Sequence, residues 1–560
     1  MFARTSATLI LALQLFFSAH AQNDTIKFSP CPLIGAYYPP PSSSSIQESG
    51  LATQAKRDFD ELIQNGGHKV YGKIFNTTSF SVVYFTGFDA KPGNSALFEY
   101  HHTSPRDTKN HNVLINSDTK FPLAQVSMVF TVYGWLLAMG EQWTAPITKF
   151  LPQLRDEKKL LSIPWEDITI GDLAGHTSGL PRTSSACVIG KDCKSSDFLK
   201  AVAPEQPVFL PSTSPMISYT SFQLLAAAME STSKSSFAEV LESKMFKPLN
   251  LNSSGLLGQK NLPIFVEAGL NRSLIGEPAF VPEFEFRLTK SGIWLIESNR
   301  ALSIVSTLGD LARAGTAMLS SKLASKAITR RWLHHNVDTS NLRNGVGYPW
   351  EIYRAGSKPI NPIIDIFTKS GALGSYASYF GISPDLKLGF AIVAHDETVT
   401  DGNLDLNVYV DLVSESIQLL QGVAGKETAT AYSGKFTGGN GNSAVLSLGD
   451  LKPGIEIKSL LVNGTDVKKQ VAEKMGVKLE SLDYRLYPTN IRDSKRHQFV
   501  AVLQDRDAPV DAGTPTCITW QSVGTMIDLP YTFVFELDGE GKANAVTFGR
   551  GEGEKVFSRA

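Results

Sequence analysis

The run LAGHTSGLPR, from Leu173 to Arg182, decides the fold of this 560-residue chain. It ends a longer segment, WEDITIGDLAGHTSGLPR (residues 165–182), in which DLAG has helical character. The glycine and proline that follow DLAG predict a turn that closes this short helix. The run therefore shapes a loop, and we interpret it as a marker of fold rather than of activity.

Regular elements are predicted on the N-terminal side of this loop. A helix is expected around residues 51–65, and strands are expected at SFSVVYF (79–85) and SALFEYHH (95–102). The apolar run FPLAQVSMVFTVYGWLLAMG (121–140) predicts a buried helix whose first turn begins near Gln125.

Helices and strands also alternate on the C-terminal side of the loop. FQLLAAAMESTSK (222–234) and the region 299–320 predict helices, and GSYASYFGISPDLKLGFAIVAHD (374–396) predicts two strands joined by a Pro-Asp turn. From about residue 426 the pattern changes to short alternating strands with glycine turns, as in TFVFELDGEGKANAVTFGR. An α/β domain of catalytic type followed by an all-β domain is therefore expected.

Domain boundaries follow from these changes of pattern. A chain of this length with 42% hydrophobic residues can bury large cores and should divide into several domains. We predict a signal peptide at residues 1–21, a Pro/Ser-rich N-terminal segment at 22–50, the α/β domain at 51–425 and the β-rich domain at 426–560.

Taken together, these features resemble the serine β-lactamase-related family, the group of class C β-lactamases, DD-peptidases and esterase-like proteins. LAGHTSGLPR is similar to the family's LLSHTSGLPR, and FQLLAAAME and Thr368-Lys369-Ser370-Gly371 follow at family-like distances. The nearest resemblance is to secreted fungal members with a C-terminal β domain. It implies an α+β (α/β) fold, with an antiparallel sheet flanked by helices and a helical subdomain.

The family's acyl-transfer chemistry uses the clusters S-x-x-K, Y-x-N and K-[ST]-G. At the first cluster this chain carries Gln125 and Met128, and neither an amide nor a thioether can replace the nucleophile or its base. PSTSPMISYTSFQLL aligns with the family's second cluster and places Ile217 at the tyrosine and Tyr219 at the asparagine.

Only the third cluster is retained, as Lys369, Ser370 and Gly371. Two readings of Lys369 are open: a cation that can attract an anionic ligand, or a charge retained by descent. The resemblance therefore implies a pocket around these seven residues in which no catalytic residue remains.

Other matches to the motifs in this chain lack the expected context. Ser117–Lys120 lies in a strand-like segment that would separate the two side chains, and Ser231–Lys234 lies at the polar end of a helix. Lys290–Gly292 repeats the K-S-G triplet without the following hairpin. Ser127 lies about 200° around the helix axis from Gln125 and should point away from the pocket.

Three hypotheses of function remain. The first is a pseudoenzyme of this fold that uses its cleft to bind a small molecule or peptide, which could be anionic. The second is an enzyme with altered chemistry in the same pocket, in which Gln125, Tyr219 and Lys369 polarise a carbonyl or move a proton, for instance in tailoring a natural product. The third is hydrolysis or acyl transfer through an unexpected serine.

The N-terminus predicts export. Arg4 precedes the apolar run TLILALQLFF, which ends at Ala19-His20-Ala21, the pattern of a cleaved secretory signal. No other segment is long and apolar enough to suggest a membrane span. A secreted glycoprotein is expected, with candidate N-glycosylation sites at Asn23, Asn76, Asn252, Asn271 and Asn463.

Cysteine and charge usage complete the expectations. Cys187 and Cys193 bracket a short glycine-containing loop and should form a disulfide in an oxidising compartment, whereas pairing of Cys31 with Cys517 stays open. No metal-ligand spacing occurs, so neither a metal nor another cofactor is expected. The formal charge of -1 gives no reason to expect nucleic acid as a partner.

Overall fold

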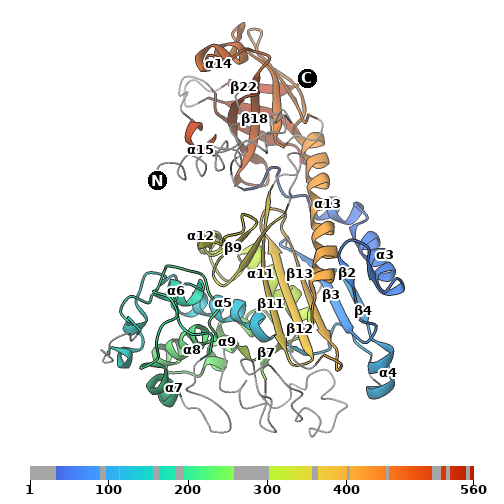
Figure 1. Ribbon diagram of the computed structural model, residues 1–560. Helices are drawn as coiled ribbons and strands as arrows, with labels where there is room; N and C mark the ends of the chain where they lie inside the picture. The colour runs from blue at the N-terminus through green and yellow to red at the C-terminus, as the bar shows by residue number, and fades with distance from the viewer. Residues whose placement is uncertain are drawn as a thin grey trace, which may run out of the picture. The chain divides into compact units, whose positions relative to one another are not determined.

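The computed structural model describes residues 33, 35–88, 96–112, 114–155, 163–183, 195–257, 302–355, 363–399, 404–449, 453–507, 519–524, 530–549 and 555–560. Its contacts divide the chain into a larger unit, Tyr38–Ser357 with Asn361–Glu427, and a smaller unit made mainly of Thr428–Ala560 (Figure 1). Among the described residues, no helix has the length and apolarity needed to cross a bilayer.

The larger unit is built on one eight-stranded sheet in which every neighbouring pair of strands is antiparallel. This confirms the predicted antiparallel sheet, including the two strands on either side of the Pro-Asp turn. In spatial order the strands are β4 (Ala96–His102), β3 (Ser79–Thr86), β13 (Leu388–His395), β12 (Tyr376–Ser383), β11 (Ile364–Leu373), β10 (Glu351–Ala355), β9 (Asn344–Val346) and β8 (Val337–Asp338).

Each face of the sheet is covered by helices. Side chains alternate between the faces of a strand, so Phe80, Val82 and Tyr84 of β3 pack with α3 (Leu51–Gln64) and α13 (Asn407–Tyr432). Val83 and Phe85 of the same strand pack in the other core, with α5 (Ser127–Met139), α8 (Tyr219–Ser233) and α11 (Leu308–Ser320). All eight residues of β3 are buried, which explains its almost continuous apolar sequence.

Most predicted elements of this unit are confirmed, but the helix expected at 299–320 begins only at Leu308. Thr307 caps it by accepting a hydrogen bond from the Asp310 N–H, and Ile304–Ser306 before the cap forms the strand β7.

The remaining described elements of this unit are short helices and strands. They are α2 (Ser43–Glu48), α4 (Pro105–His111), α6 (Ile170–Ala174), α7 (Ser195–Val202), α9 (Phe237–Leu241), α12 (Lys326–Trp332), η1 (Ala124–Val126), η2 (Ile147–Lys149), η3 (Pro152–Leu154), η5 (Glu242–Phe246), β1 (Gly67–His68), β2 (Gly72–Lys73), β5 (Phe121–Pro122) and β6 (Gly255–Leu256).

The smaller unit is a strand barrel, as the predicted C-terminal β domain requires. The strand order is β15-β14-β22-β21-β20-β19-β18-β16-β17, and an additional pairing of β15 with β16 closes the ring. The strands are β14 (Gly434–Thr437), β15 (Ser443–Ser447), β16 (Ile455–Val462), β17 (Thr465–Asp466), β18 (Leu482–Arg492), β19 (Arg496–Asp505), β20 (Thr532–Leu537), β21 (Ala543–Phe548) and β22 (Lys555–Arg559).

This unit also contains helices that the strand-only prediction missed, α14 (Val467–Met475) and the short α15 (Thr519–Ser522). Asp466 caps α14, and Val467, Val471 and Ala472 place its apolar face in the barrel core. Their spacing is helical, but the polar residues between them hide the pattern in so short a segment.

Candidate functional site

The loop that carries the fold-deciding run is anchored by one buried carboxylate. Asp172 Oδ2 accepts hydrogen bonds from the Thr169 N–H (3.0 Å) and hydroxyl (2.6 Å). The first of these bonds, together with the bond from the Asp172 N–H to Thr169 Oγ1 at 3.1 Å, forms the capping box of α6. Asp172 Oδ1 accepts from the hydroxyls of Thr177 (2.9 Å) and Ser212 (2.6 Å). The short helix, the loop and the segment around Ser212 are thus tied to a single side chain.

Backbone hydrogen bonds then join the loop to the segment that leads into α8. Met216 N–H donates to His176 O at 2.7 Å, and Tyr219 N–H donates to Arg182 O at 2.7 Å. Ser218 adds a bond from its hydroxyl to Pro181 O at 2.7 Å. These contacts fix the first residue of α8, so the Tyr219 side chain has a defined position.

Gln125 and Tyr219, two predicted pocket residues, meet there. The Gln125 amide oxygen accepts the Ala372 N–H at 2.7 Å, and its amide nitrogen donates to Tyr219 Oη at 3.0 Å. A backbone N–H needs an oxygen acceptor, so the orientation of the Gln125 amide is determined by this bond. Arg182 Nη2 also donates to Tyr219 Oη, at 2.8 Å. The side chain at the family's nucleophile position is therefore a hydrogen-bonded amide.

Ala372 lies on the part of β11 that extends beyond β10. β10 begins at Glu351, which is paired with Thr368, so the N–H groups that follow Thr368 on that side of β11 have no partner in β10. Glu351 Oε2 accepts the Ser370 N–H at 3.0 Å, and Gln125 accepts that of Ala372. Two side chains thus provide the acceptors that a neighbouring strand would have supplied.

Gly371 is required at this edge because the η1 backbone approaches it closely. A Cβ atom at Gly371 would lie 2.5 Å from Leu123 O and 3.0 Å from Gln125 N. No side chain fits there without movement of the backbone. The third residue of the retained K-S-G cluster therefore has a steric role that does not depend on catalysis.

Lys369 is buried, and its ammonium group forms an ion pair with Glu351. It also donates to Ser370 O at 3.1 Å. Burial opposes ionisation of Glu351, but the positive charge of Lys369 and the bonds from Lys369 and Ser370 outweigh it and hold the pKa of that carboxyl below its ordinary value. The charge of Lys369 is thus paired with that of Glu351, and the reading of Lys369 as a cation that attracts an anion stays a prediction.

The remaining predicted pocket residues belong to the core. Met128 is fully buried in the core beside the sheet, and Ile217 is half-buried against the same core. Ser127 is also buried, and its hydroxyl accepts the Ile304 N–H at 3.1 Å. The prediction that Ser127 points away from the pocket is confirmed.

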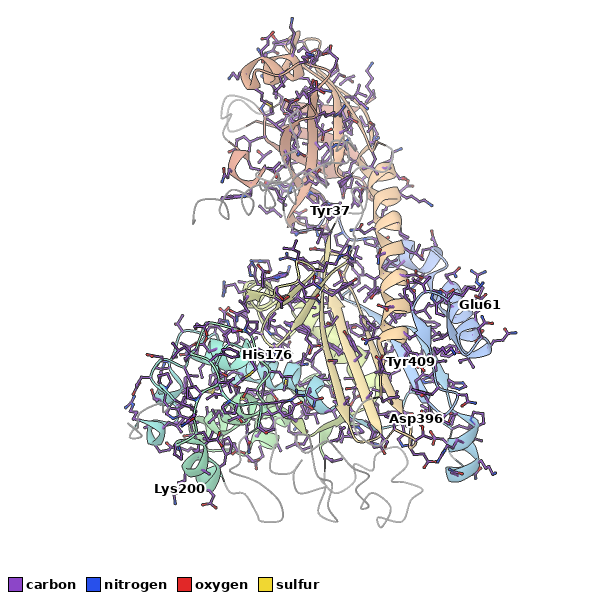
Figure 2. All side chains as sticks on the ribbon, viewed as in Figure 1. Tyr37, Glu61, His176, Lys200, Asp396 and Tyr409 are labelled. Carbon is purple, nitrogen blue, oxygen red and sulfur yellow. The ribbon has the colours of Figure 1, made fainter. Side chains whose placement is uncertain are left out.

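His176 is a buried residue of this site that sequence reasoning did not single out. It lies where the helical region faces the sheet (Figure 2), and it has a left-handed backbone conformation with φ of 61°. Its Nε2 lies 3.0 Å from Pro349 O, and its Nδ1 has no hydrogen-bond partner. Burial, together with the charge of Lys369, lowers the pKa of His176 to about 4.

A specific acid sensitivity should follow from the neutral state of His176. The unfolded chain binds a proton at this residue below its ordinary pKa of 6.5, whereas the folded chain does so only near pH 4. The free energy of unfolding should therefore fall by about 3 kcal/mol from this residue as the pH is lowered from above 6.5 to 4. Denaturant unfolding across this range should show a weaker pH dependence for His176→Asn, which can still donate to Pro349 O; equal slopes would contradict the prediction.

Sequence reasoning missed two other contributors, Glu351 and Arg182. Arg182 lies in the quoted run, but its contact with Tyr219 depends on the fold of the loop. Glu351 is outside every motif, and only the pairing of β10 with β11 brings it to Lys369. No pattern local to either residue indicates these contacts.

The remaining predictions concern glycosylation, metal binding and cysteine pairing. Asn76, Asn252 and Asn463 are exposed. Within the described ranges, no group of three or more His, Cys, Asp or Glu side chains could hold a metal ion. Several predictions concern residues outside the described ranges: those for Asn23, Asn271, Cys31, Cys187, Cys193, Cys517, Lys290–Gly292 and the signal peptide.

Known proteins are similar to the two parts of this chain. Residues 81–414 match the sequence model of the β-lactamase family, and residues 424–549 match that of the "Beta-lactamase-like-like, C-terminal domain". A "Beta-lactamase-like protein" of Arthroderma benhamiae is 25% identical over 486 residues, which cover 81% of this chain and 75% of the relative. The "Beta-lactamase" of Escherichia coli K12 is 23% identical over 330 residues, which cover 52% of this chain and 79% of the relative.

Among solved structures, a class C β-lactamase from Rhodobacter sphaeroides superimposes with a TM-score of 0.46 at 16% identity. The superposition covers 66% of this chain and 99% of that one. The sequence match at residues 81–414 alone spans more than half of the 560 residues. The chain therefore belongs to the β-lactamase family.

Proposed function

We propose that this chain is an exported, non-catalytic member of the β-lactamase family that binds a small molecule or peptide at the site around Gln125. The observation that carries the proposal is the Gln125 amide, which joins the Ala372 N–H to the Tyr219 hydroxyl. An amide cannot attack an acyl carbonyl, and here both of its polar atoms are engaged. Export rests on the N-terminal pattern, and a secreted chain beginning at Gln22 would support it.

The serines near the site do not replace the missing nucleophile. Ser127 is buried and bonded to the backbone of β7. Ser370 donates to Glu351 Oε2 at 3.0 Å, an arrangement that resembles a nucleophile beside a base. However, Glu351 is paired with Lys369 and its pKa is lowered, so it has little tendency to take a proton from a hydroxyl.

The Ala372 N–H at the β11 edge is the donor that a ligand carbonyl would use. A ligand carbonyl that approaches the Ala372 N–H has to displace the Gln125 amide, which competes with it as an internal acceptor. The matched relatives named penicillin-binding proteins, from Amycolatopsis lactamdurans and Bacillus subtilis, support a small acyl compound or peptide as the kind of ligand. Because Lys369 is paired with Glu351, the proposed ligand does not have to be anionic.

The test is incubation of the purified chain with a serine-directed fluorophosphonate and with a chromogenic β-lactam. We expect no mass adduct and no hydrolysis above background, because the nucleophile and its base are both absent. An active family member serves as the positive control. A stoichiometric adduct, mapped with Ser370→Ala and Ser127→Ala variants, would overturn the non-catalytic assignment.

A second candidate function is altered chemistry at Tyr219. Its hydroxyl lies 2.8 Å from the Arg182 guanidinium and 3.0 Å from the Gln125 amide. A hydroxyl in that position could transfer a proton to or from a bound carbonyl compound. Turnover of any ligand that is abolished by Tyr219→Phe while binding is retained would favour this candidate.

A further inference from the structure

The barrel carries a cluster of charged side chains on its outer face. Ile455 and Ile457 of β16 point into the barrel core, as do Leu482, Tyr484 and Leu486 of β18. The charged residues between them therefore point outward. With Arg506, which follows β19, and Lys468 of α14, they form the cluster of Glu456, Lys458, Lys468, Asp483, Arg485 and Arg506.

Part of this outer face is shielded from water. Glu456, Asp483 and Arg485 have exposed fractions of 5%, 1% and 1%. Arg485 also donates to Pro453 O at 3.3 Å and Gly454 O at 3.4 Å, so the turn before β16 covers it. Charges in such a position are screened less than those in open solvent and need partners of opposite sign.

The carboxylates of the cluster are shared by more cations than they can neutralise. Asp483 accepts from Arg485 Nε at 2.9 Å and from Arg506 Nη2 at 2.6 Å. Glu456 contacts Lys458 Nζ at 2.8 Å, and it also contacts Arg485 at 3.5 Å and Arg506 at 3.3 Å. Two carboxylates thus contact three cations, which leaves an excess of one positive charge.

Lys468 raises this excess to two. It is half-buried near the start of α14, and its ammonium group has no hydrogen bond or ion pair with any described residue. Burial lowers its pKa, and the positive charges of Arg506 and Lys458 act in the same direction, against the attraction of Glu456 and Asp483.

No further carboxylate of the described part of the barrel forms an ion pair with a cation of the cluster. Asp505 and Asp507 flank Arg506 in the sequence, but their oxygens accept from the Asp507 N–H at 3.0 Å and the Ser481 hydroxyl at 2.6 Å. Neither forms an ion pair with a cation of the cluster in the described part of the chain.

We propose that this cluster is a binding site for a phosphate or sulfate group, held by Lys468 with Lys458 and Arg506. A doubly charged oxyanion would balance the excess of two positive charges among these six side chains. Its oxygens would accept the unused N–H donors of Lys468 in charge-assisted hydrogen bonds. The group could be a free ion or an ester on a larger molecule, and both offer the same oxygens.

The test is titration of the full chain with sodium phosphate, at an ionic strength held constant with sodium chloride, followed by calorimetry and by the thermal midpoint. Wild-type chain should bind saturably, and Lys468→Gln should weaken binding by at least about tenfold. Lys469→Gln is the matched control, because Lys469 is the next residue of α14, is exposed and lies 4.0 Å from Glu473. It removes the same formal charge and should change affinity by less than about twofold.

Each outcome decides for or against the site. Equal losses in the two variants, or a wild-type response no larger than that to chloride alone, would overturn it. Without phosphate, Lys468→Gln should unfold at the wild-type temperature or above, because an unpaired cation has been removed, and this excludes misfolding as the cause of lost affinity. Phenyl phosphate binding as tightly as inorganic phosphate would identify an ester on a larger ligand, and a clear preference for inorganic phosphate would identify a free ion.

Discussion

The triple variant Gln125→Ser, Met128→Lys, Ile217→Tyr should react with a serine-directed fluorophosphonate at least about a thousandfold faster than the wild-type chain. Its three substitutions restore the family's nucleophile, its neighbouring lysine and the tyrosine of the second cluster. The surrounding frame is intact, because Gly371 still allows close approach of η1 and the Ala372 N–H still points at residue 125. That N–H, released from the Gln125 amide, can stabilise a developing oxyanion.

Single variants separate chemistry from stability in this experiment. Gln125→Ser alone should remain close to wild-type reactivity, because a serine without a base is a weak nucleophile. Met128→Lys alone should lower the free energy of unfolding by about 3 kcal/mol or more, because Met128 is fully buried. Circular dichroism establishes that the triple variant is folded. A folded but unreactive triple variant would show that the site has also changed shape.

Gly179→Ala should be among the most destabilising single substitutions in the chain. The φ of Gly179 is 68°, and a Cβ atom there would lie 1.9 Å from the Phe209 carbonyl oxygen, which belongs to the backbone. Neither group can move without breaking the bond from Val208 N–H to Gly179 O at 2.8 Å. We expect a loss of about 4 kcal/mol or more in the free energy of unfolding, measured by denaturant titration.

Gly66→Ala is the matched control for this substitution. Its φ of 62° is similar, but no atom lies within 4 Å of the added Cβ. It should therefore show only the backbone strain, about 1 kcal/mol. Equal losses in the two variants would mean that the clash with Phe209 is relieved at little cost and that the loop is not held as tightly as its hydrogen bonds imply.

The sequence was a good guide where one local pattern determines the outcome. The loop around Gly179, the helix after Gln125 and the hairpin after Lys369 are all present at the predicted positions. It was a poorer guide where the structure of a short segment depends on strands that are distant in the sequence. Ile304–Ser306 has few residues and forms the strand β7 only by pairing with β5 and β6, which lie far away in the chain.

Alignment with the family motifs predicted one contact of the site and missed another. Alignment placed Gln125 and Tyr219 near each other, and their bond is present. It could not show that Glu351 neutralises Lys369, because that contact arises from the register of two strands rather than from a motif. Alignment identifies positions along a chain, whereas the charge state of a site depends on which residues pair across it.

The pairing of Lys369 with Glu351 also bears on how this chain can evolve. Loss of Glu351 alone would leave a buried ammonium group without a counter-ion, and loss of Lys369 alone would leave a carboxylate without its cation. Only a double substitution removes both charges at once. A chain that loses the two residues one after the other therefore passes through a single variant with a lower free energy of unfolding. Purifying selection for stability can thus preserve a lysine long after selection for turnover has ended.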